Sequence, residues 1–392
     1  MRVALIHYWL LGMRGGEKVL EGICRLFPEA DIFTLFYDPE AVSPLIRSHT
    51  VKPSFLNPLR GAYRSLLPLM PMALEDFDLR PYDLVISSES GPAKGVLTSA
   101  TSQHFCYCHT PMRYLWELYP AYRREFGEST LKRVALAPIA SYMRLWDYAS
   151  AARVDGFMAN SRNVGRRIWR TYRRRSTLVY PPVAVDTFRF QPPEDYFLMV
   201  GEMVPCKCMN YAIRLFAQSG RKLKIVGKGP EYRALKKLAG PTVEFCGHVT
   251  DTELRQLYSR CRALVVPGEE DFGITMVEAL ASGKPVIALA RGGAMEIVEN
   301  GRGILYPERT AASLEEALEN FDRIESLIDP EKSICSAGKY SEAAFEKRFL
   351  AALEEMWRRQ QPPQASPNSR SGPALVRPIQ SVAGLASLAA GD

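Results

Sequence analysis

The sequence predicts an α/β protein made of two parallel-sheet domains, and three observations support this prediction. Short apolar runs that suit buried strands alternate with segments of helical apolar spacing, as in sheets covered by helices on both faces. The alternation stops at a proline-rich stretch after Tyr180 and then starts again. The length of 392 residues is too great for one ordinary core and fits two domains with additions.

The first domain is assigned to residues 1–182 and opens with an apolar run, 2–8, that predicts a buried strand. A glycine-rich turn follows at 10–16 and leads into a predicted helix at 17–27. Further strands are expected at 31–36, 83–87, 104–107, 156–159 and 177–180, and further helices at 129–152 and 164–172.

The second domain is assigned to residues 194–343. Strands are expected at 196–200, 223–226, 243–246 and 263–266, and after Pro285; helices are expected at 210–218, 230–238, 251–261 and 273–281. Two such domains in series place a ligand cleft between them, at the carboxyl ends of the strands. An amphipathic helix is predicted at 344–360. The remainder, 361–392, is rich in Pro, Ser, Gly and Ala without a period and is predicted to be disordered.

The composition indicates a globular protein of the cytosol. Apolar residues make up 47% of the chain and aromatic residues 10%, and no run of about 18 apolar residues offers a membrane span. The start of the chain lacks the pattern of a secretory signal, so a reducing cytoplasmic location is expected. Cys106 and Cys108, like Cys206 and Cys208, are separated by one residue. Structural zinc sites usually have at least two residues between paired cysteines, so buried free thiols are predicted instead.

The segment from Arg162 to Arg175 has seven arginines and no acid, with Trp169 and Tyr172 among them. We expect this basic helix to lie against anionic lipid headgroups, at the inner face of the cell membrane. A solvated helix face is the alternative. A nucleic-acid interface is not expected, because nothing else in the chain resembles an RNA- or DNA-binding module.

The stretch 263–297 carries the strongest functional signal. A strand runs into an acidic loop with Glu270, and a helix follows with Glu278 eight positions further on. A helix N-terminus offers free N–H groups and a partial positive charge that suit a diphosphate, and two carboxylates beside it can accept hydrogen bonds from sugar hydroxyls. The alternative is an ordinary strand-loop-helix unit whose acidic residues only cap the helix.

The run Glu270-Asp271-Phe272-Gly273 through Glu278, with the Gly292-Gly293 turn after it, is similar to the E-x7-E motif of glycosyltransferase family 4. These are retaining enzymes of the GT-B fold, with two Rossmann-like domains. The resemblance implies that Glu270 contacts the donor sugar and Glu278 the nucleotide ribose. Phe272, Gly273 and Ile274, at the helix start, are predicted to belong to the donor site. It also implies that helix 344–360 crosses back toward the first domain.

Further candidate residues follow the ends of predicted strands. Gly15 and Gly16 open the first helix and resemble the family loop near the donor diphosphate and the acceptor. His109 matches the family's active-site histidine. Lys207 matches a phosphate-binding lysine, which would stabilise the leaving group. The chain departs from the family pattern at Glu202, which replaces an arginine, so Lys228 on the next loop is a candidate substitute.

The sequence therefore predicts a retaining glycosyltransferase that needs neither metal nor cofactor. It would move a hexose from a nucleoside diphosphate sugar to a glycan or lipid-linked acceptor. The runs 107–116 and 267–273 resemble bacterial mannosyltransferases of polysaccharide assembly, so mannose is the preferred sugar. His109, Glu270 and Lys207 are the candidate catalytic residues. A sugar-nucleotide epimerase of the same fold and a non-catalytic, transferase-derived binding protein remain alternatives.

Overall fold

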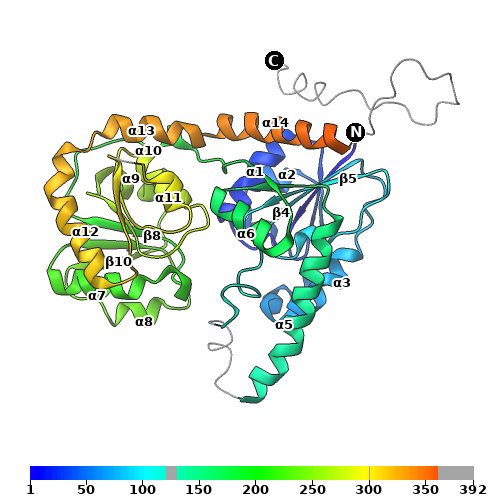
Figure 1. Cartoon of the computed structure of the whole chain (residues 1–392), viewed down its shortest axis with the longest axis horizontal. Coiled ribbons are helices and arrows are strands. Elements are labelled where there is room, and N and C mark those ends of the chain that lie inside the picture. Colours follow the sequence, from blue (N-terminus) through cyan, green and yellow to red (C-terminus); the bar gives the residue numbers. More distant parts are fainter. Residues whose placement is uncertain (121–129, 300, 361–392) are drawn as a thin grey trace, which may run out of the picture. The chain divides into compact units, whose positions relative to one another are not determined.

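The computed structural model describes residues 1–120, 130–299 and 301–360, which fold into two compact units. The first unit contains residues 1–158 and 171–179 and the described chain from 346 onward; the second contains 159–170 and 180–345. Each unit is a sheet covered by helices (Figure 1). The tail predicted to be disordered, 361–392, lies outside the described residues.

The first unit is built on a seven-stranded sheet with the order β3-β2-β1-β4-β5-β6-β7. Its strands are β1 (Val3–His7), β2 (Asp31–Thr34), β3 (Val51–Pro53), β4 (Leu84–Glu89), β5 (Gln103–Cys108), β6 (Gly156–Ala159) and β7 (Ser176–Leu178). The helical segments between residues 1 and 179 are α1 (Gly15–Leu26), η1 (Pro39–Ala41), α2 (Pro44–Ser48), η2 (Asn57–Leu69), α3 (Met70–Glu75), η3 (Ala93–Gly95), α5 (Thr130–Ser150), η4 (Ala151–Arg153) and α6 (Arg162–Tyr172), and most of α6 belongs to the second unit.

The order of this sheet reverses between β1 and β4, which are parallel neighbours with His7 opposite Ser88. In open α/β sheets such a switch point, at the carboxyl ends of the strands, is the usual place for a ligand. His7 and Ser88 lie at those ends. The topology therefore points to this edge of the first sheet as a functional position.

The second unit is built on a six-stranded sheet with the order β10-β9-β8-β11-β12-β13. Its strands are β8 (Phe197–Val200), β9 (Leu223–Val226), β10 (Val243–Gly247), β11 (Leu264–Val266), β12 (Val286–Leu289) and β13 (Gly303–Tyr306). Its helical segments are η5 (Val185–Thr187), η6 (Pro205–Lys207), α7 (Met209–Ser219), α8 (Tyr232–Lys236), α9 (Asp251–Arg260), α10 (Ile274–Ala281), α11 (Ala294–Ile297), α12 (Ala311–Ile324), η7 (Glu325–Leu327), α13 (Pro330–Ala337) and η8 (Gly338–Tyr340). The last helix, α14 (Glu342–Gln360), begins in this unit and belongs to the first from residue 346 onward. Here the order reverses between β8 and β11.

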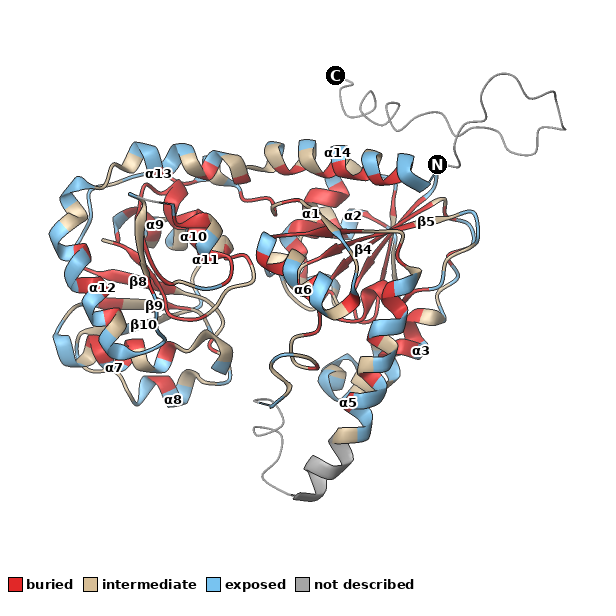
Figure 2. Ribbon diagram, viewed as in Figure 1, coloured by how far each residue is buried: buried red, intermediate tan, exposed pale blue. Residues whose placement is uncertain are grey.

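The central strands β8, β11 and β12 of the second sheet are apolar throughout because both faces of the sheet are covered. Leu264 and Val266 of β11 pack into one hydrophobic cluster, whereas Val265 between them packs into another on the opposite face. Figure 2 shows the strands as buried and the outer faces of the helices as exposed. Each such fully buried aliphatic side chain contributes about 1.5–3 kcal/mol to stability. This burial on both sides explains why the strands read as continuous apolar runs.

Local signals set the helix ends. Thr250 begins α9 with a capping box: its hydroxyl accepts the Glu253 N–H at 3.3 Å and the Glu253 carboxylate accepts the Thr250 N–H at 2.8 Å. The helix predicted at 230–238 is shorter, since α8 spans only Tyr232–Lys236. Its end tightens into a turn in which the Leu238 N–H bonds to the Leu235 carbonyl, three residues back. Among the described helices, none combines the length and the apolar content that crossing a bilayer requires.

Candidate active site

The loop between β11 and α10 holds the acidic run of the motif, and Gly273 makes its geometry possible. Gly273 has φ +104°, a conformation that side chains disfavour, and a Cβ there would lie 2.0 Å from the Met276 Cε atom. The helix begins directly after it, at Ile274. The first N–H groups of α10 therefore follow Glu270 within a few residues, as the motif predicts.

Lys207 and Glu270 form an ion pair across the switch point of the second sheet. Lys207 ends η6, on the loop after β8, and Glu270 lies on the loop after β11. The Lys207 Nζ atom lies 2.5 Å from each carboxylate oxygen of Glu270. Their side chains keep 27% and 16% exposure, so both remain accessible to a ligand. The structure thus brings together two predicted catalytic residues that are 63 positions apart in the chain.

The loop of Lys207 is held by neighbouring backbone. A Cβ on Gly268 would lie 2.8 Å from the Lys207 Cα atom, so only glycine lets the two loops approach this closely. The Met203 N–H donates to the Lys228 carbonyl at 2.8 Å, which ties the loop after β8 to the loop after β9. Lys228 itself is exposed and Glu202 is half-buried. Lys228, the predicted substitute for the missing arginine, therefore lies on a loop directly bonded to that of Lys207.

Glu278 is buried in the body of α10. Its side chain is 6% exposed and accepts a hydrogen bond from the Tyr258 hydroxyl at 2.8 Å. Burial raises the pKa of Tyr258 well above its ordinary value, and the charge of Glu278 raises it further. Tyr258 is a phenol that stays protonated and donates to the carboxylate. Sequence reasoning missed it, because only its helical position on α9 marks it.

The other two acidic residues of the loop, Glu269 and Asp271, pair with a different cation. Arg167 of α6 contacts Glu269 at 2.5 Å through Nη2 and pairs with Asp271 through Nη1. The Ser161 hydroxyl donates to the Asp271 carbonyl at 2.7 Å. The three consecutive carboxylates are therefore divided between Arg167 and Lys207. Arg167, more than a hundred residues away in sequence, was not identified as part of this site.

The remaining predicted donor-site residues, Phe272, Gly273 and Ile274, lie at the start of α10. The Phe272 ring is buried and packs against Tyr180 and Tyr340, so it belongs to the hydrophobic core. The Gly293 N–H donates to the Glu270 carbonyl at 2.8 Å, which fixes the acidic loop from its other side. Phe272, Gly273 and Ile274 can offer a ligand their main-chain groups at the start of α10.

In the first unit, Gly16 and His109 lie close together. A Cβ on Gly16 would lie 3.6 Å from the His109 Nε2 atom and 2.7 Å from the Tyr8 hydroxyl. Gly15 opens α1 at the same place. His109 follows β5, its N–H donates to the Glu89 carbonyl at 2.7 Å, and its Nε2 atom lies 2.9 Å from the Ser88 hydroxyl. The predicted residues of the first domain therefore form one cluster near the β1–β4 switch point.

His109 is neutral at physiological pH. Burial, with a smaller contribution from His7, lowers the pKa of His109 to about 3. A neutral imidazole has one N–H donor and one lone-pair acceptor, so it can orient a hydroxyl but carries no charge. His7 and Ser88, which surround it, were not among the predicted residues; their place at two adjacent strand ends was the available signal.

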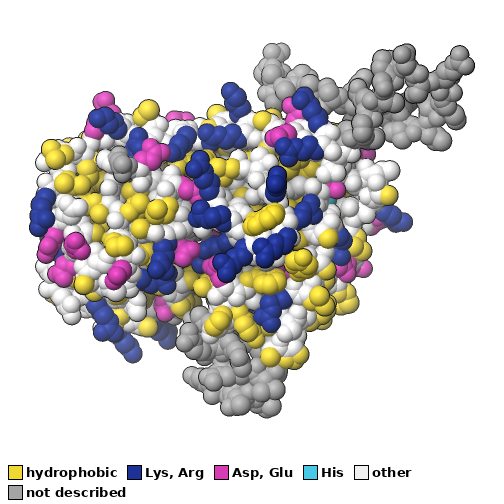
Figure 3. Space-filling model, in the orientation of Figure 1, with side chains coloured by type: hydrophobic (Ala, Val, Ile, Leu, Met, Phe, Trp, Pro, Cys, Tyr) yellow, Lys and Arg dark blue, Asp and Glu magenta, His cyan; other side chains and the backbone are white. Residues whose placement is uncertain are grey.

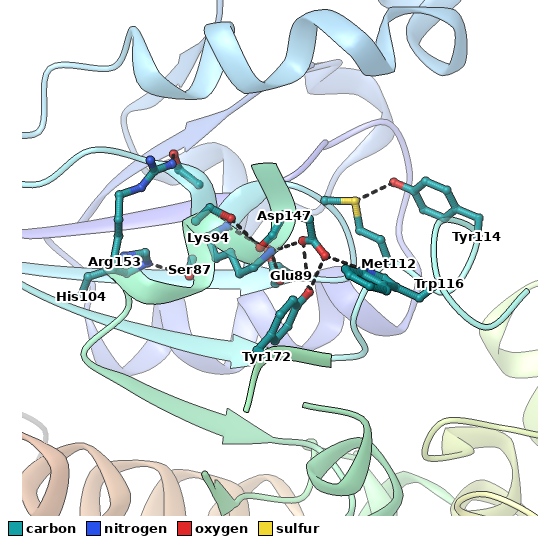
Figure 4. A network of polar contacts seen from close by, with 12 residues as sticks. Ser87, Glu89, Lys94, His104, Met112, Tyr114, Trp116, Asp147, Arg153 and Tyr172 are labelled. Carbon is teal, nitrogen blue, oxygen red and sulfur yellow. Dashed lines mark hydrogen bonds and ion pairs between the residues drawn. The ribbon is translucent and has the colours of Figure 1, made fainter. Parts of the chain in front are cut away.

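A buried polar network lies beside this cluster (Figure 4). The Lys94 ammonium is fully buried, pairs with Asp147 and lies 3.4 Å from Glu89. Tyr172 and Trp116 also donate to Asp147, at 3.0 and 2.7 Å. Burial alone would lower the pKa of Lys94, but the charges of Asp147 and Glu89 raise it above its ordinary value. Burial raises the pKa of Glu89 to about 7, against the lowering effect of Lys94.

The arginines between Arg162 and Arg175 divide into two groups. Arg167 makes the ion pairs described above, and Arg174 donates to the carbonyls of Ala151, Val154 and Asp155. The exposed members are Arg162, Arg166, Arg170, Arg173 and Arg175, and Trp169 beside them is 50% exposed. Figure 3 shows lysine and arginine side chains gathered on the face it displays. Two of the seven arginines thus have structural roles, and five remain for a surface function.

The cysteines whose spacing suggested zinc are free thiols. Cys106 and Cys108 are buried, as predicted, whereas Cys206 and Cys208 are only half-buried. The latter pair lies on the loop after β8, which faces solvent more than the strand does. The prediction of buried thiols is therefore right for the first pair and wrong for the second.

Comparisons with known proteins place this sequence among glycosyltransferase-like chains. Residues 186–334 match the family model described as Glycosyl transferases group 1. An uncharacterized glycosyltransferase of Methanocaldococcus jannaschii is 26% identical over 201 residues, which cover 50% of this chain and 55% of that protein. The O-antigen chain mannosyltransferase RfbU of Salmonella typhimurium is 28% identical over 200 residues, covering 48% and 56%. The chain spans about half the length of the curated relatives it matches.

Solved structures resemble the fold over most of the chain. HepE of Anabaena in complex with UDP has a TM-score of 0.67 at 17% identity and covers 91% of this chain and 100% of its own. A sucrose-phosphate synthase from Thermosynechococcus elongatus has a TM-score of 0.68 at 17% identity, covering 92% and 100%. At this identity the likeness establishes the fold alone, and it confirms the predicted GT-B fold class.

Proposed function

Since residues 186–334 match the family model of the glycosyl transferases of group 1, we propose that this enzyme moves a hexose from a nucleoside diphosphate sugar to a glycan or lipid-linked acceptor. The observation that carries the proposal is the Lys207–Glu270 pair at the β8–β11 switch point, with the N-terminus of α10 and Glu278 following on the same segment. These groups offer a cation and main-chain donors to a diphosphate, and carboxylates to the hydroxyls of two sugars.

Mannose is the preferred sugar. The names of several relatives support it, among them a GDP-mannose-dependent α-mannosyltransferase of Mycobacterium tuberculosis, 38% identical over 110 residues that cover 28% of this chain and 29% of that protein. A solved neighbour of the same fold, HepE, binds UDP-glucose. The proposed donor is therefore GDP-mannose, and a UDP-hexose is the alternative that a direct comparison must test.

The proposed reaction retains the configuration at the anomeric carbon and uses no metal ion. The acceptor oxygen bonds to that carbon as its bond to the diphosphate breaks, and the departing phosphate oxygen takes the acceptor's proton. Lys207 and the first N–H groups of α10 stabilise the charge that develops on the diphosphate, and Glu270 and His109 orient the sugar. The charge distribution supports metal independence, because Arg167 and Lys207 pair with all three carboxylates of the acidic loop and offset two of their three charges.

The proposed acceptor surface includes the anionic inner face of the cell membrane. The five exposed arginines between Arg162 and Arg175, with the half-exposed Trp169, supply the basic and aromatic groups that favour headgroup binding. This part of the proposal rests on exposure and charge.

Calorimetric titration with GDP-mannose and UDP-glucose, each with and without EDTA, tests the donor site. Binding that survives EDTA and is lost in Glu278→Ala is expected. The absence of binding by both donors would favour a non-catalytic binding protein. Conversion of the donor to its sugar epimer without any acceptor would favour the epimerase alternative, and turnover abolished by EDTA would remove metal independence.

A further inference from the structure

A series of polar side chains leads from Glu17 through His7 and Ser88 to His109. The first three of these side chains are buried. The Ser88 hydroxyl lies between two imidazoles, 3.3 Å from the Nδ1 atom of His7 and 2.9 Å from the Nε2 atom of His109. His7 and Ser88 face each other in register on β1 and β4. This places the series of side chains at the switch point of the first sheet, next to Gly16.

Glu17 lies at the end of this series that is opposite to His109. Its Oε1 atom lies 3.6 Å from the His7 Nε2 atom, and the two side chains are 2% and 0% exposed. Its other oxygen accepts the Arg14 N–H at 2.9 Å, which holds the carboxylate at the start of α1. The buried His7 Nε2 atom has no hydrogen-bond partner among the described residues, so the carboxylate is the group that it faces.

The number of hydrogens on each group decides which atom donates in each of these contacts. A serine hydroxyl has one hydrogen, so Ser88 can donate to only one of the two rings and must accept from the other. A carboxylate facing the His7 Nε2 atom favours a proton on that nitrogen. In a neutral His7 this leaves Nδ1 as the acceptor. Ser88 then donates to His7, and its lone pair accepts the Nε2–H of His109.

We propose that Glu17, His7 and Ser88 are positioning residues that fix His109 as its Nε2–H tautomer, with its Nδ1 atom as the acceptor. The importance of this tautomer for sugar transfer rests on the proposed function, but the tautomer itself does not. None of the three residues needs to touch the substrate. They act by holding one ring nitrogen of His109, as a carboxylate holds the imidazole of other enzymes in a productive tautomer.

Strand β4 and its other neighbour, β5, provide a control. Ser87, one residue before Ser88, lies 2.9 Å from the Nε2 atom of His104 and forms a second buried serine–histidine pair (Figure 4). Successive residues of a strand point to opposite faces of the sheet, so this pair lies on the other face. Ser87→Ala removes a hydrogen bond of the same kind, at a more deeply buried position, without touching the groups that lead to His109.

The experiment is nitrogen NMR of the full protein with labelled histidine at about pH 8, where an ordinary histidine with pKa near 6.5 is neutral. The wild-type protein is expected to show the Nε2–H tautomer of His109. Ser88→Ala and Glu17→Gln are expected to shift His109 toward a mixture of tautomers, whereas Ser87→Ala leaves its signals in place. Glu17→Gln keeps an acceptor for the Arg14 N–H and serves if Ser88→Ala does not fold.

Turnover of GDP-mannose gives the second measurement. Ser88→Ala is expected to lower kcat about tenfold, the value of one hydrogen bond, with KM little changed, and Ser88→Thr, which keeps the hydroxyl, is expected to restore part of it. An imidazolium at His7, an Nδ1–H tautomer at His109 in the wild type, or an unchanged His109 in both Ser88→Ala and Glu17→Gln would overturn the proposal. The spectra decide this even if no donor is turned over, which would count against the proposed function alone.

Discussion

Lys207 holds both carboxylate oxygens of Glu270, each at 2.5 Å from its Nζ atom. Without a ligand, the cation proposed to bind a diphosphate is therefore neutralised by the carboxylate proposed to bind the sugar. A diphosphate must share Lys207 with Glu270 or displace it. This competition makes opposite predictions for the two residues.

Lys207→Ala is expected to weaken binding of GDP by about 1–3 kcal/mol, because a charge-assisted contact is lost. Glu270→Gln is expected to strengthen binding of GDP, which lacks the sugar, because it releases Lys207, while it weakens binding of GDP-mannose relative to GDP. Calorimetry of both ligands measures these effects. Lys228→Ala tests separately whether this predicted substitute on the adjoining loop also contacts the diphosphate. Weaker GDP binding in Glu270→Gln would contradict the competition.

Tyr258→Phe is expected to destabilise the second unit by about 1.5–3 kcal/mol, because the buried Glu278 carboxylate loses a donor at 2.8 Å. Urea unfolding measures the change. Tyr196→Phe is the matched control, since its hydroxyl donates at 2.8 Å to a neutral acceptor, the Leu257 carbonyl, and its loss should cost about 1 kcal/mol. Equal losses of unfolding free energy in the two variants would show that the hydrogen bond to the Glu278 carboxylate stabilises the protein no more than one to a neutral acceptor.

Glu89→Gln is expected to change how stability depends on pH. Burial raises the pKa of Glu89 to about 7, so the folded protein binds a proton there that the unfolded chain releases near its ordinary pKa of 4.5. The stability that this carboxyl contributes is thus present below that value and is lost as pH rises toward 7. Relative to the wild type, Glu89→Gln should gain on the order of 2 kcal/mol between pH 4.5 and 7.5.

Chemical denaturation of the wild type and of Glu89→Gln across this pH range measures the gain in unfolding free energy. Subtracting one free energy from the other removes the contributions of titrating groups that both proteins share. His104 is one such group: burial, together with the charges of Arg153 and Lys94, lowers its pKa to about 3, so its stability contribution is lost as pH falls below about 6.5. A difference between the two proteins that stays constant with pH would contradict the raised pKa of Glu89.

Reversing Arg166 and Arg170 to glutamate is expected to reduce binding to anionic lipid vesicles by at least tenfold, because each basic group near such a surface contributes about 1 kcal/mol. Cosedimentation with phosphatidylglycerol vesicles measures it, with neutral phosphatidylcholine as the reference. Lys236→Glu with Lys237→Glu changes the net charge equally on another exposed segment. The same loss in both double variants would assign the effect to net charge and not to this helix.

The sequence allowed the buried strands and the motif to be predicted because both are local patterns. The strands at 156–159 and 223–226 were predicted with the bounds that the structure has, since each is an apolar run between turn residues. β3 was missed because it is a three-residue edge strand that ends in Pro53, and β13 because it begins at Gly303 and is only half-buried. Short strands at the edge of a sheet carry little hydrophobic pattern.

Some residues of the candidate site could likewise be predicted from local sequence, and others could not. The strand ends and helix starts that carry Gly16, His109, Lys207 and Glu270 could be read from the sequence, because the fold places all such ends along one edge of a sheet. Their partners could not. Ser88 meets His7 across 81 positions and Arg167 meets Glu269 across 102, and nothing local in the sequence specifies such pairs. Only the three-dimensional fold selects them.

The glycine turn after β12 has a consequence for natural variation in this chain. Ideal Cβ atoms would lie 2.1 Å from the Glu270 carbonyl oxygen at Gly292 and 1.8 Å from the Phe272 carbonyl oxygen at Gly293. Any larger amino acid would push the acidic segment out of place. A genetic screen for inactive alleles should therefore recover both glycines alongside Glu270, although neither has a functional group to lose.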